Sequence, residues 1–161
     1  MESILNRALT NFQKEHDMNT PLRNLSDLSG RALLAVLFLI AGFGKLGAYA
    51  GTQAYMASKG VPGALLPLVI ALELGGGALI VAGLWTRATA LALAGFTILA
   101  ALLFHANFAD QTQQIMFLKN VAIAGGFLLL AANGAAAWSL DALRARQPKR
   151  GLSWQAGSSN A

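Results

Sequence analysis

Four long apolar runs set the pattern of hydrophobic and polar positions along this chain. Their connections are short except for the first, the amphipathic residues 50–63. The runs cover residues 31–49, 62–85, 88–108 and 115–138. Each approaches the ~20 residues that a helix needs to cross the hydrocarbon core of a bilayer. Short connections between consecutive helices favour antiparallel neighbours. The pattern therefore predicts an all-α, integral membrane, up-down four-helix bundle.

Polar segments flank this membrane domain, which we place at residues 30–141. Residues 1–29 lack the apolar core of a signal peptide and are interpreted as a polar extension. Within it, "LNRALTNFQKEH" fits a short helix on the membrane surface, and a disordered extension is the alternative. Because "MNTPLRNLSDLSGR" resembles a natural start at Met18, we expect residues 1–17 to be dispensable. Residues 142–161 form a basic segment that we expect to be disordered.

The composition supports a membrane protein and removes several kinds of chemistry. Hydrophobic residues make up 55% of the 161-residue chain and charged residues only 12%, against about a quarter charged in soluble domains. The chain has no cysteine, which excludes disulfides, iron–sulfur clusters and thiolate zinc sites built by this chain. Its histidines, His16 and His105, are far apart in the sequence, so we predict no metal site.

The charge of +5 reflects basic residues that flank the spans, which argues against nucleic acid as a partner. With four spans, one side of the membrane receives nine cations and both termini: Arg7, Lys14, Arg23, Arg31, Arg87, Arg144, Arg146, Lys149 and Arg150. The other side receives Lys45, Lys59 and Lys119. Loops rich in lysine and arginine remain in the cytoplasm. We therefore expect both termini to be cytoplasmic.

Each predicted helix places a polar side chain in the outer half of the bundle. At 1.5 Å per residue, Lys45 lies about 21 Å along the first span, Glu73 about 16 Å from the outer surface, and His105 about 27 Å along the third span. Lys119 and Asn120 begin the fourth span at the same face. This shared depth predicts one polar cluster inside the bundle.

Glu73 is the most informative member of the cluster. A charge at the centre of a span costs about 2.5–3.5 kcal/mol on insertion scales, so Glu73 should face inward, be protonated or pair with a cation. Lys45 is the first candidate partner, and Lys119 the second, although Lys119 could extend to the interface instead. "ELGGG" then supplies small residues that let helix backbones approach closely.

Two interpretations of the cluster remain open. In one, Glu73 and Lys45 form a buried pair that only fixes helix register. In the other, the cluster lines a ligand pocket in which Glu73 and His105 transfer protons. The candidate ligand-binding residues are then Lys45, Glu73, His105, Asn107, Lys119 and Asn120. For His105 the alternative is a position at the membrane interface, and for the two asparagines it is helix capping or hydrogen bonding between helices.

A series of motifs resembles the DoxX family of small four-helix membrane proteins. They are, in order, "RALLAVLFLIAGFGKL", "KGVPG", "ELGGGALIVAGLWTR", "LLFHANFAD", "FLKNVAIAGG" and "WSLD". The resemblance covers roughly residues 30–141 and implies a bacterial inner-membrane protein. Some members of that family are membrane subunits of a thiosulfate–quinone oxidoreductase, and others are linked to quinones, catechols or oxidative stress.

The leading functional hypothesis is a redox-linked membrane subunit that binds quinone, or another small aromatic molecule, in the outer half of the bundle. Net oxidation would require a partner protein, because the chain offers no evident metal or flavin site. A non-enzymatic scaffold or assembly factor is the first alternative. Transport of a small solute is the second, and four short helices would need to form a homo-oligomer for it. The lipid bilayer is a partner under every hypothesis.

Overall fold

The computed structural model describes the backbone of residues 2–146 and the side chains of residues 20–146. It is all-helical over this range: α1 (Glu2–Gly47), α2 (Tyr49–Ser58), a 3-10 turn η1 (Gly63–Leu65), α3 (Leu66–Ala82), α4 (Thr86–Phe104), α5 (Gln111–Asn133) and α6 (Leu140–Arg146). Four segments are long and apolar enough to span a membrane: residues 20–47, 63–82, 86–104 and 111–133. The predicted fold class is confirmed in its helices and its four spans.

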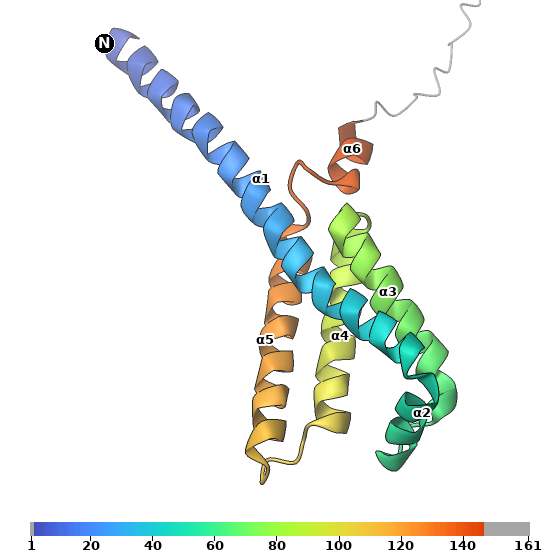
Figure 1. Ribbon diagram of the computed structural model, residues 1–161. Helices are drawn as coiled ribbons and strands as arrows, with labels where there is room; N and C mark the ends of the chain where they lie inside the picture. The colour runs from blue at the N-terminus through green and yellow to red at the C-terminus, as the bar shows by residue number, and fades with distance from the viewer. Residues whose placement is uncertain (1, 147–161) are drawn as a thin grey trace, which may run out of the picture.

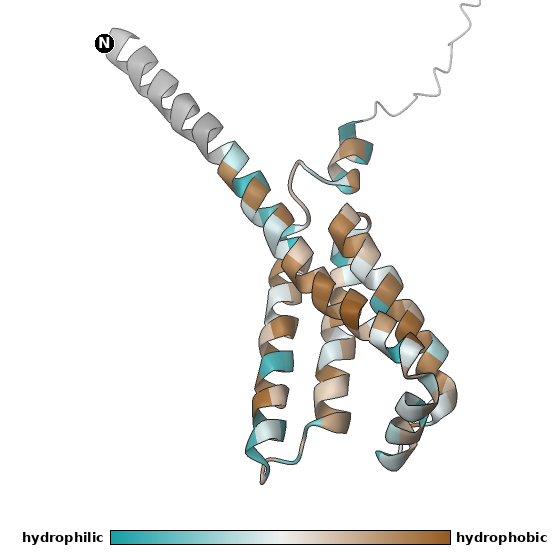
Figure 2. Cartoon of the chain, in the orientation of Figure 1, coloured by the Kyte–Doolittle hydropathy of each residue, from teal (hydrophilic) through white to brown (hydrophobic). Residues whose placement is uncertain are grey.

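The helices run alternately up and down (Figure 1). α1 packs along α3, and α4 packs along α5. The start of α1 and α6 lie at one end of the bundle, whereas α2 and the α4–α5 loop lie at the other. Figure 2 shows that the four spans consist largely of hydrophobic residues, as the hydrocarbon core of a bilayer requires.

Element boundaries differ from the sequence prediction at both ends of the chain. α1 is continuous from Glu2, where we expected a separate surface helix or disorder over residues 1–29. At the other end, α5 ends at Asn133 and Gly134 caps it with a φ of 72°, so Trp138 lies in a loop after the span. Of the expected disordered tail, residues 142–146 belong to α6 and residues 147–161 lie outside the described residues.

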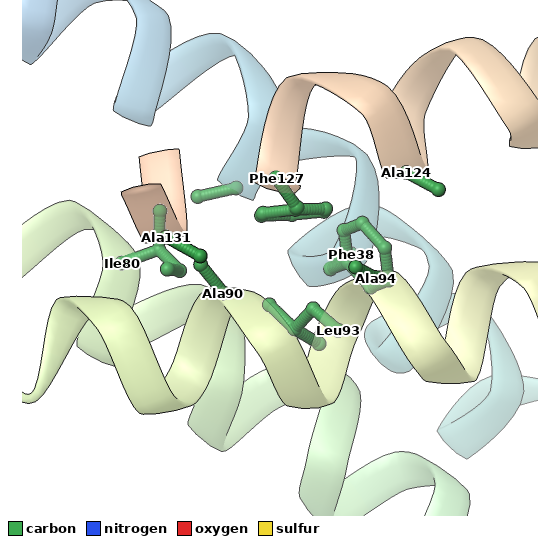
Figure 3. Packing of buried hydrophobic residues seen from close by; sticks show 9 residues of the cluster. Phe38, Ile80, Ala90, Leu93, Ala94, Ala124, Phe127 and Ala131 are labelled. Atoms are coloured by element: carbon green, nitrogen blue, oxygen red, sulfur yellow. The ribbon is translucent and has the colours of Figure 1, made fainter. Parts of the chain in front are cut away.

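The main apolar core lies in the half of the bundle nearer α6, where all four spans meet. Phe38 of α1 and Phe127 of α5 pack edge to face, with ring centroids 5.3 Å apart. Ile80 of α3 and Leu93 of α4 are fully buried beside them (Figure 3). A smaller cluster of Met56, Leu66 and Ile70 joins α2 to α3 at the opposite end. Between the two clusters lies a region of the bundle that belongs to neither of them.

The glycines of "ELGGG" have different surroundings. A Cβ on Gly76 would lie 3.0 Å from Leu93, and one on Gly77 would lie 3.0 Å from Leu39, so both positions allow α3 to pack closely on its neighbours. Gly75 is exposed, and a Cβ there would have nothing within 4 Å. The expectation that these glycines serve helix packing is therefore met by two of the three.

A buried arginine ties α1 to α3 and to the α5–α6 loop. Arg31 is 1% exposed and donates from Nη1 to the carbonyls of Ile80 and Val81, at 3.2 and 2.7 Å. Its Nη2 donates to the Trp138 carbonyl at 2.6 Å, and its Nε to Asp27 at 2.9 Å. From the sequence we expected Arg31 to be only a flanking cation. Its buried position was not anticipated.

Asp27 and Asn24 extend this arrangement from the preceding turns of α1. Asp27 Oδ2 also accepts from the amide of Ala136 at 3.1 Å, and Asn24 Oδ1 accepts from the amide of Ala137 at 3.3 Å. These contacts satisfy backbone groups of an irregular loop, which would otherwise be costly to bury. One face of α1 therefore holds the loop that follows α5.

Gly83 should be the most sensitive glycine near this arginine. Its φ is 64°, and a Cβ there would lie 2.4 Å from Ser139 Cβ and 2.7 Å from Arg31 Nη1. Gly83→Ala should therefore lower the free energy of unfolding by about 2–4 kcal/mol, from backbone strain and overpacking together. Gly75→Ala is the matched control and should raise it by about 0.5–1 kcal/mol. Equal effects of the two substitutions on unfolding in mild detergent would contradict this account.

Asp141, the last residue of "WSLD", caps α4 from a distance. Its carboxylate accepts from the amides of Trp85 and Thr86, both at 2.8 Å, and its own amide donates to the Gly83 carbonyl at 2.8 Å. Burial, the largest single influence, raises the pKa of Asp141. The hydrogen bonds from Thr86 and Trp85 and the charge of Arg144 together outweigh it, so the pKa lies below its ordinary value.

This depressed pKa predicts a pH-dependent stability. Asp141→Ala should lower the free energy of unfolding at pH 7 by about 0.5–2 kcal/mol, the usual effect of losing a helix cap. Because the folded-state pKa is the lower one, the carboxylate stabilises the fold fully above the unfolded pKa near 4 and loses this effect as the pH falls through the folded value. Unfolding of both proteins at pH 7 and pH 3 would test this. A difference that stays constant with pH would contradict the capping role.

Candidate functional site

A cavity of about 520 Å³ lies between the two apolar clusters. Its walls come from α1, α2, α3 and α4, with a smaller contribution from α5. The lining is mainly aliphatic and includes the aromatic rings of Phe38, Tyr55, Phe96 and Phe104. The volume falls within the range of about 300–1,000 Å³ that is typical of small-molecule sites.

Lys45 and Glu73 lie at the wall of this cavity and form an ion pair. Lys45 Nζ is 2.7 Å from Glu73 Oε1, and the side chains are 27% and 5% exposed. Close packing of α1 on α3 makes the pair possible, because a Cβ on Gly42 would lie 2.6 Å from Leu74. The sequence prediction that Glu73 faces inward and pairs with Lys45 is confirmed.

The carboxylate of Glu73 is only half satisfied. Oε1 accepts from Lys45, whereas Oε2 is buried and has no hydrogen-bond partner among the described residues. Other polar groups of the lining are occupied elsewhere. The hydroxyls of Thr52 and Thr97 donate to the carbonyls of Ala48 and Leu93 in their own helices.

His105 and Asn120 also line the cavity. His105 directly follows α4, and its Nδ1 lies 2.8 Å from Gln113 Oε1. Asn120 of α5 donates from Nδ2 to the Met116 carbonyl at 3.0 Å. Gln113, which holds the imidazole, was not anticipated, because a glutamine in the polar start of a helix carries no signal that distinguishes it from a surface residue.

The remaining two candidates, Asn107 and Lys119, are not brought into the cavity. Both are exposed, and neither lines it. Consecutive residues of a helix are 100° apart, so with Asn120 turned to the cavity the neighbouring Lys119 is directed away from it. The structure thus brings together Lys45, Glu73, His105 and Asn120.

One side of the cavity opens at the lipid-facing surface. Leu65 lies just before α3 and Leu68 lies in its first turn, whereas Leu99 and Leu103 belong to α4. These four leucines line the cavity and are 42–67% exposed. A molecule dissolved in the hydrocarbon of the bilayer could therefore enter between α3 and α4 without passing through water.

α2 covers the end of the cavity nearer the α4–α5 loop. We expected residues 50–63 to be only a connection, but Tyr49–Ser58 forms a helix. Tyr55 of α2 stacks on Phe104 of α4, with ring centroids 5.6 Å apart and planes 24° apart. Lys59 lies over the Tyr55 ring, 5.9 Å from its centroid. Through these contacts α2 covers the aromatic side chains of the cavity lining.

Comparison with known proteins identifies relatives of the whole membrane domain. The chain is 55% identical over 122 residues to the inner membrane protein YqjF of Escherichia coli, covering 76% of this chain and 94% of that protein. It is 40% identical over 122 residues to the E. coli inner membrane protein YphA, covering 71% of this chain and 86% of that protein. No solved structure matches. The DoxX family model matches residues 26–106, which contain Lys45, Glu73 and His105, and the chain therefore belongs to the DoxX family.

Proposed function

We propose that this protein binds a small aromatic molecule of the quinone class, taken from the bilayer, in the cavity beside Lys45 and Glu73. The observation that carries the proposal is the combination of a large apolar cavity at span depth with a hydrogen-bonding ion pair at its wall. Most of a ligand pocket is apolar, and a few placed polar groups fix the orientation of the ligand. An ionisable residue inside a membrane is a functional candidate for the same reason.

The lining suits a flat ring that carries oxygen atoms. Aromatic side chains favour stacked or edge-on contacts with another ring, and the cavity offers Phe38, Phe96 and Phe104. Lys45 has three N–H donors, of which one reaches Glu73. The others can bind a ligand oxygen. His105 is the second group that could exchange a proton with a bound molecule.

In this proposal the chain is the ligand-binding membrane subunit of a redox system. Glu73 and His105 exchange protons with the ligand, and a partner protein exchanges electrons with it.

In the same proposal both termini of the membrane domain lie in the cytoplasm. The distribution of basic residues supports this orientation, with nine on that side and three on the other. Because the chain has no cysteine, single cysteines at Ser58 and Ala145 would test this orientation. An impermeant thiol reagent added to intact cells should label only the first.

A scaffold without a ligand is the second candidate. The observation that favours it is that the Lys45–Glu73 pair joins α1 to α3. Such a pair could serve only to fix the relative position of the two helices, as polar residues do in other helix bundles. Under this hypothesis the cavity would hold lipid chains and no specific molecule.

A substitution that fills the cavity with a larger side chain distinguishes the ligand-binding function from the scaffold. The protein would be purified from membranes in mild detergent, and co-extracted quinones and phenols quantified by mass spectrometry. Ala100→Phe places a ring in the cavity, because Ala100 lines it. Ala92→Phe, on the exposed face of the same helix, is the matched control.

The expected result is a stoichiometric aromatic ligand in the unmodified protein and in the Ala92→Phe variant. Ala100→Phe should remain folded and lose the ligand. Absence of any aromatic molecule from the unmodified protein, even after reconstitution with added quinone, would support the scaffold. Equal ligand content in the two variants would place the ligand elsewhere.

A further inference from the structure

We infer that the cavity prefers the hydroxyl-bearing form of its ligand, a quinol or other neutral phenol, over the corresponding carbonyl form. This inference rests on the proposed function, since it concerns the same cavity. Its basis is the unpartnered oxygen of Glu73: Oε1 accepts from Lys45 at 2.7 Å, and Oε2 is buried with no hydrogen-bond partner among the described residues.

A buried acceptor without a donor is unfavourable, because folding removes its water without replacing the hydrogen bond. The nearby protein groups do not supply one. Thr52, Thr97 and Asn120 line the cavity, but each donates to a backbone carbonyl of its own helix. The terminal torsion of a glutamate has a broad energy minimum, so a small rotation can present Oε2 to a ligand while Lys45 follows Oε1. The missing donor can therefore come from a bound molecule.

A hydroxyl meets both members of the ion pair at once. It donates to Glu73 and has lone pairs that can accept from Lys45 Nζ. A carbonyl has lone pairs only, so it can accept from Lys45 but leaves Oε2 without a donor and places two acceptors near each other. A methyl ether has the same deficiency. Hydrogen bonding thus distinguishes the reduced form from the oxidised form of one ring.

The charge of the site selects a neutral donor. Lys45 already lies 2.7 Å from the carboxylate, so a cationic amine would bring a second positive charge to an ion pair that is already balanced. An anion would face Glu73 instead. A neutral phenolic hydroxyl avoids both costs, which are large away from water.

Preferential binding of the reduced form has a redox consequence. If the quinol binds more tightly than the quinone, binding raises the reduction potential of the couple. For a two-electron couple each tenfold preference corresponds to about 30 mV. The bound ligand would therefore be a stronger oxidant than the same molecule free in the bilayer.

The test compares three ligands of equal ring and tail: a quinol, its quinone and the dimethyl ether of the quinol. Binding is measured anaerobically to the full chain in lipid nanodiscs. The quinol should bind about 10-fold to 100-fold more tightly than the other two, the range expected when a charged acceptor gains its hydrogen bond. Glu73→Gln should remove this preference because its amide can also donate to the carbonyl. Asn107→Ala should keep the preference, because Asn107 is exposed and does not line the cavity.

The outcomes separate this inference from the proposed function. Equal or tighter binding of the quinone would overturn the inference and leave the binding function intact. If none of the three ligands binds, both fail. A preference that persists in Glu73→Gln would overturn the assignment to Glu73. The comparison of the ligands on the unmodified protein does not depend on whether that variant folds.

Discussion

Replacing Arg31 by methionine should lower the free energy of unfolding by about 3–5 kcal/mol, the cost of removing one partner from a buried charged network. Methionine is apolar and shorter than arginine, so the substitution removes all four hydrogen bonds of the guanidinium. Asp27 loses its cation, and the carbonyls of Ile80, Val81 and Trp138 lose a donor. Two of these carbonyls lie in the last turn of α3, where carbonyls lack the i+4 amide that a continuing helix would supply.

Arg23→Met is the matched control for this experiment. Arg23 is exposed on the same helix, so its loss should change the free energy of unfolding by less than about 0.5 kcal/mol. Both variants would be compared with the unmodified protein by thermal unfolding in mild detergent. Equal effects of the two substitutions would mean that the contacts of Arg31 add nothing beyond a positive charge at the end of the span.

Replacing Lys45 by methionine should lower the free energy of unfolding by about 3 kcal/mol. This is the low end of the range for breaking a buried ion pair, because Lys45 is 27% exposed. The loss arises mainly from Glu73, whose carboxylate would have no partner at 5% side-chain exposure. Lys119→Met is the control, since Lys119 is exposed and does not line the cavity.

The double variant Lys45→Met/Glu73→Leu distinguishes a structural pair from a ligand site. Apolar residues of similar volume often restore the stability lost with a buried ion pair. We therefore expect the double variant to recover most of the stability and to bind no quinol. Recovery of stability together with undiminished quinol binding would show that the pair serves only to join α1 to α3.

The four spans could be predicted from hydrophobicity because their apolar runs match the thickness of the bilayer. The pairing of Glu73 with Lys45 could be predicted for a related reason: a charge at that depth needs a partner. The ends of the helices were harder to predict from the sequence. α1 begins at Glu2 because polar residues with good helix propensity can extend a helix beyond the membrane without an apolar pattern to mark them.

The roles of Arg31, Asp141 and Gln113 could not be predicted. Each depends on a contact with a residue distant in the chain or in an adjacent loop, and the sequence gives no distance between them. Arg31 has the appearance of an ordinary flanking cation until the carbonyls at the end of α3 are placed beside it. The positions of Asn107 and Lys119 outside the cavity depend on helix rotation, which depth alone does not determine.

The contact between Arg31 and Trp138 has a consequence for biogenesis. Ribosomes release a chain from its first residue to its last, and Trp138 follows all four spans. The guanidinium can therefore obtain its last acceptor only after the whole membrane domain has been synthesised. A nascent chain that stopped after α4 would leave Arg31 without its Trp138 acceptor and Asp27 without the Ala136 amide.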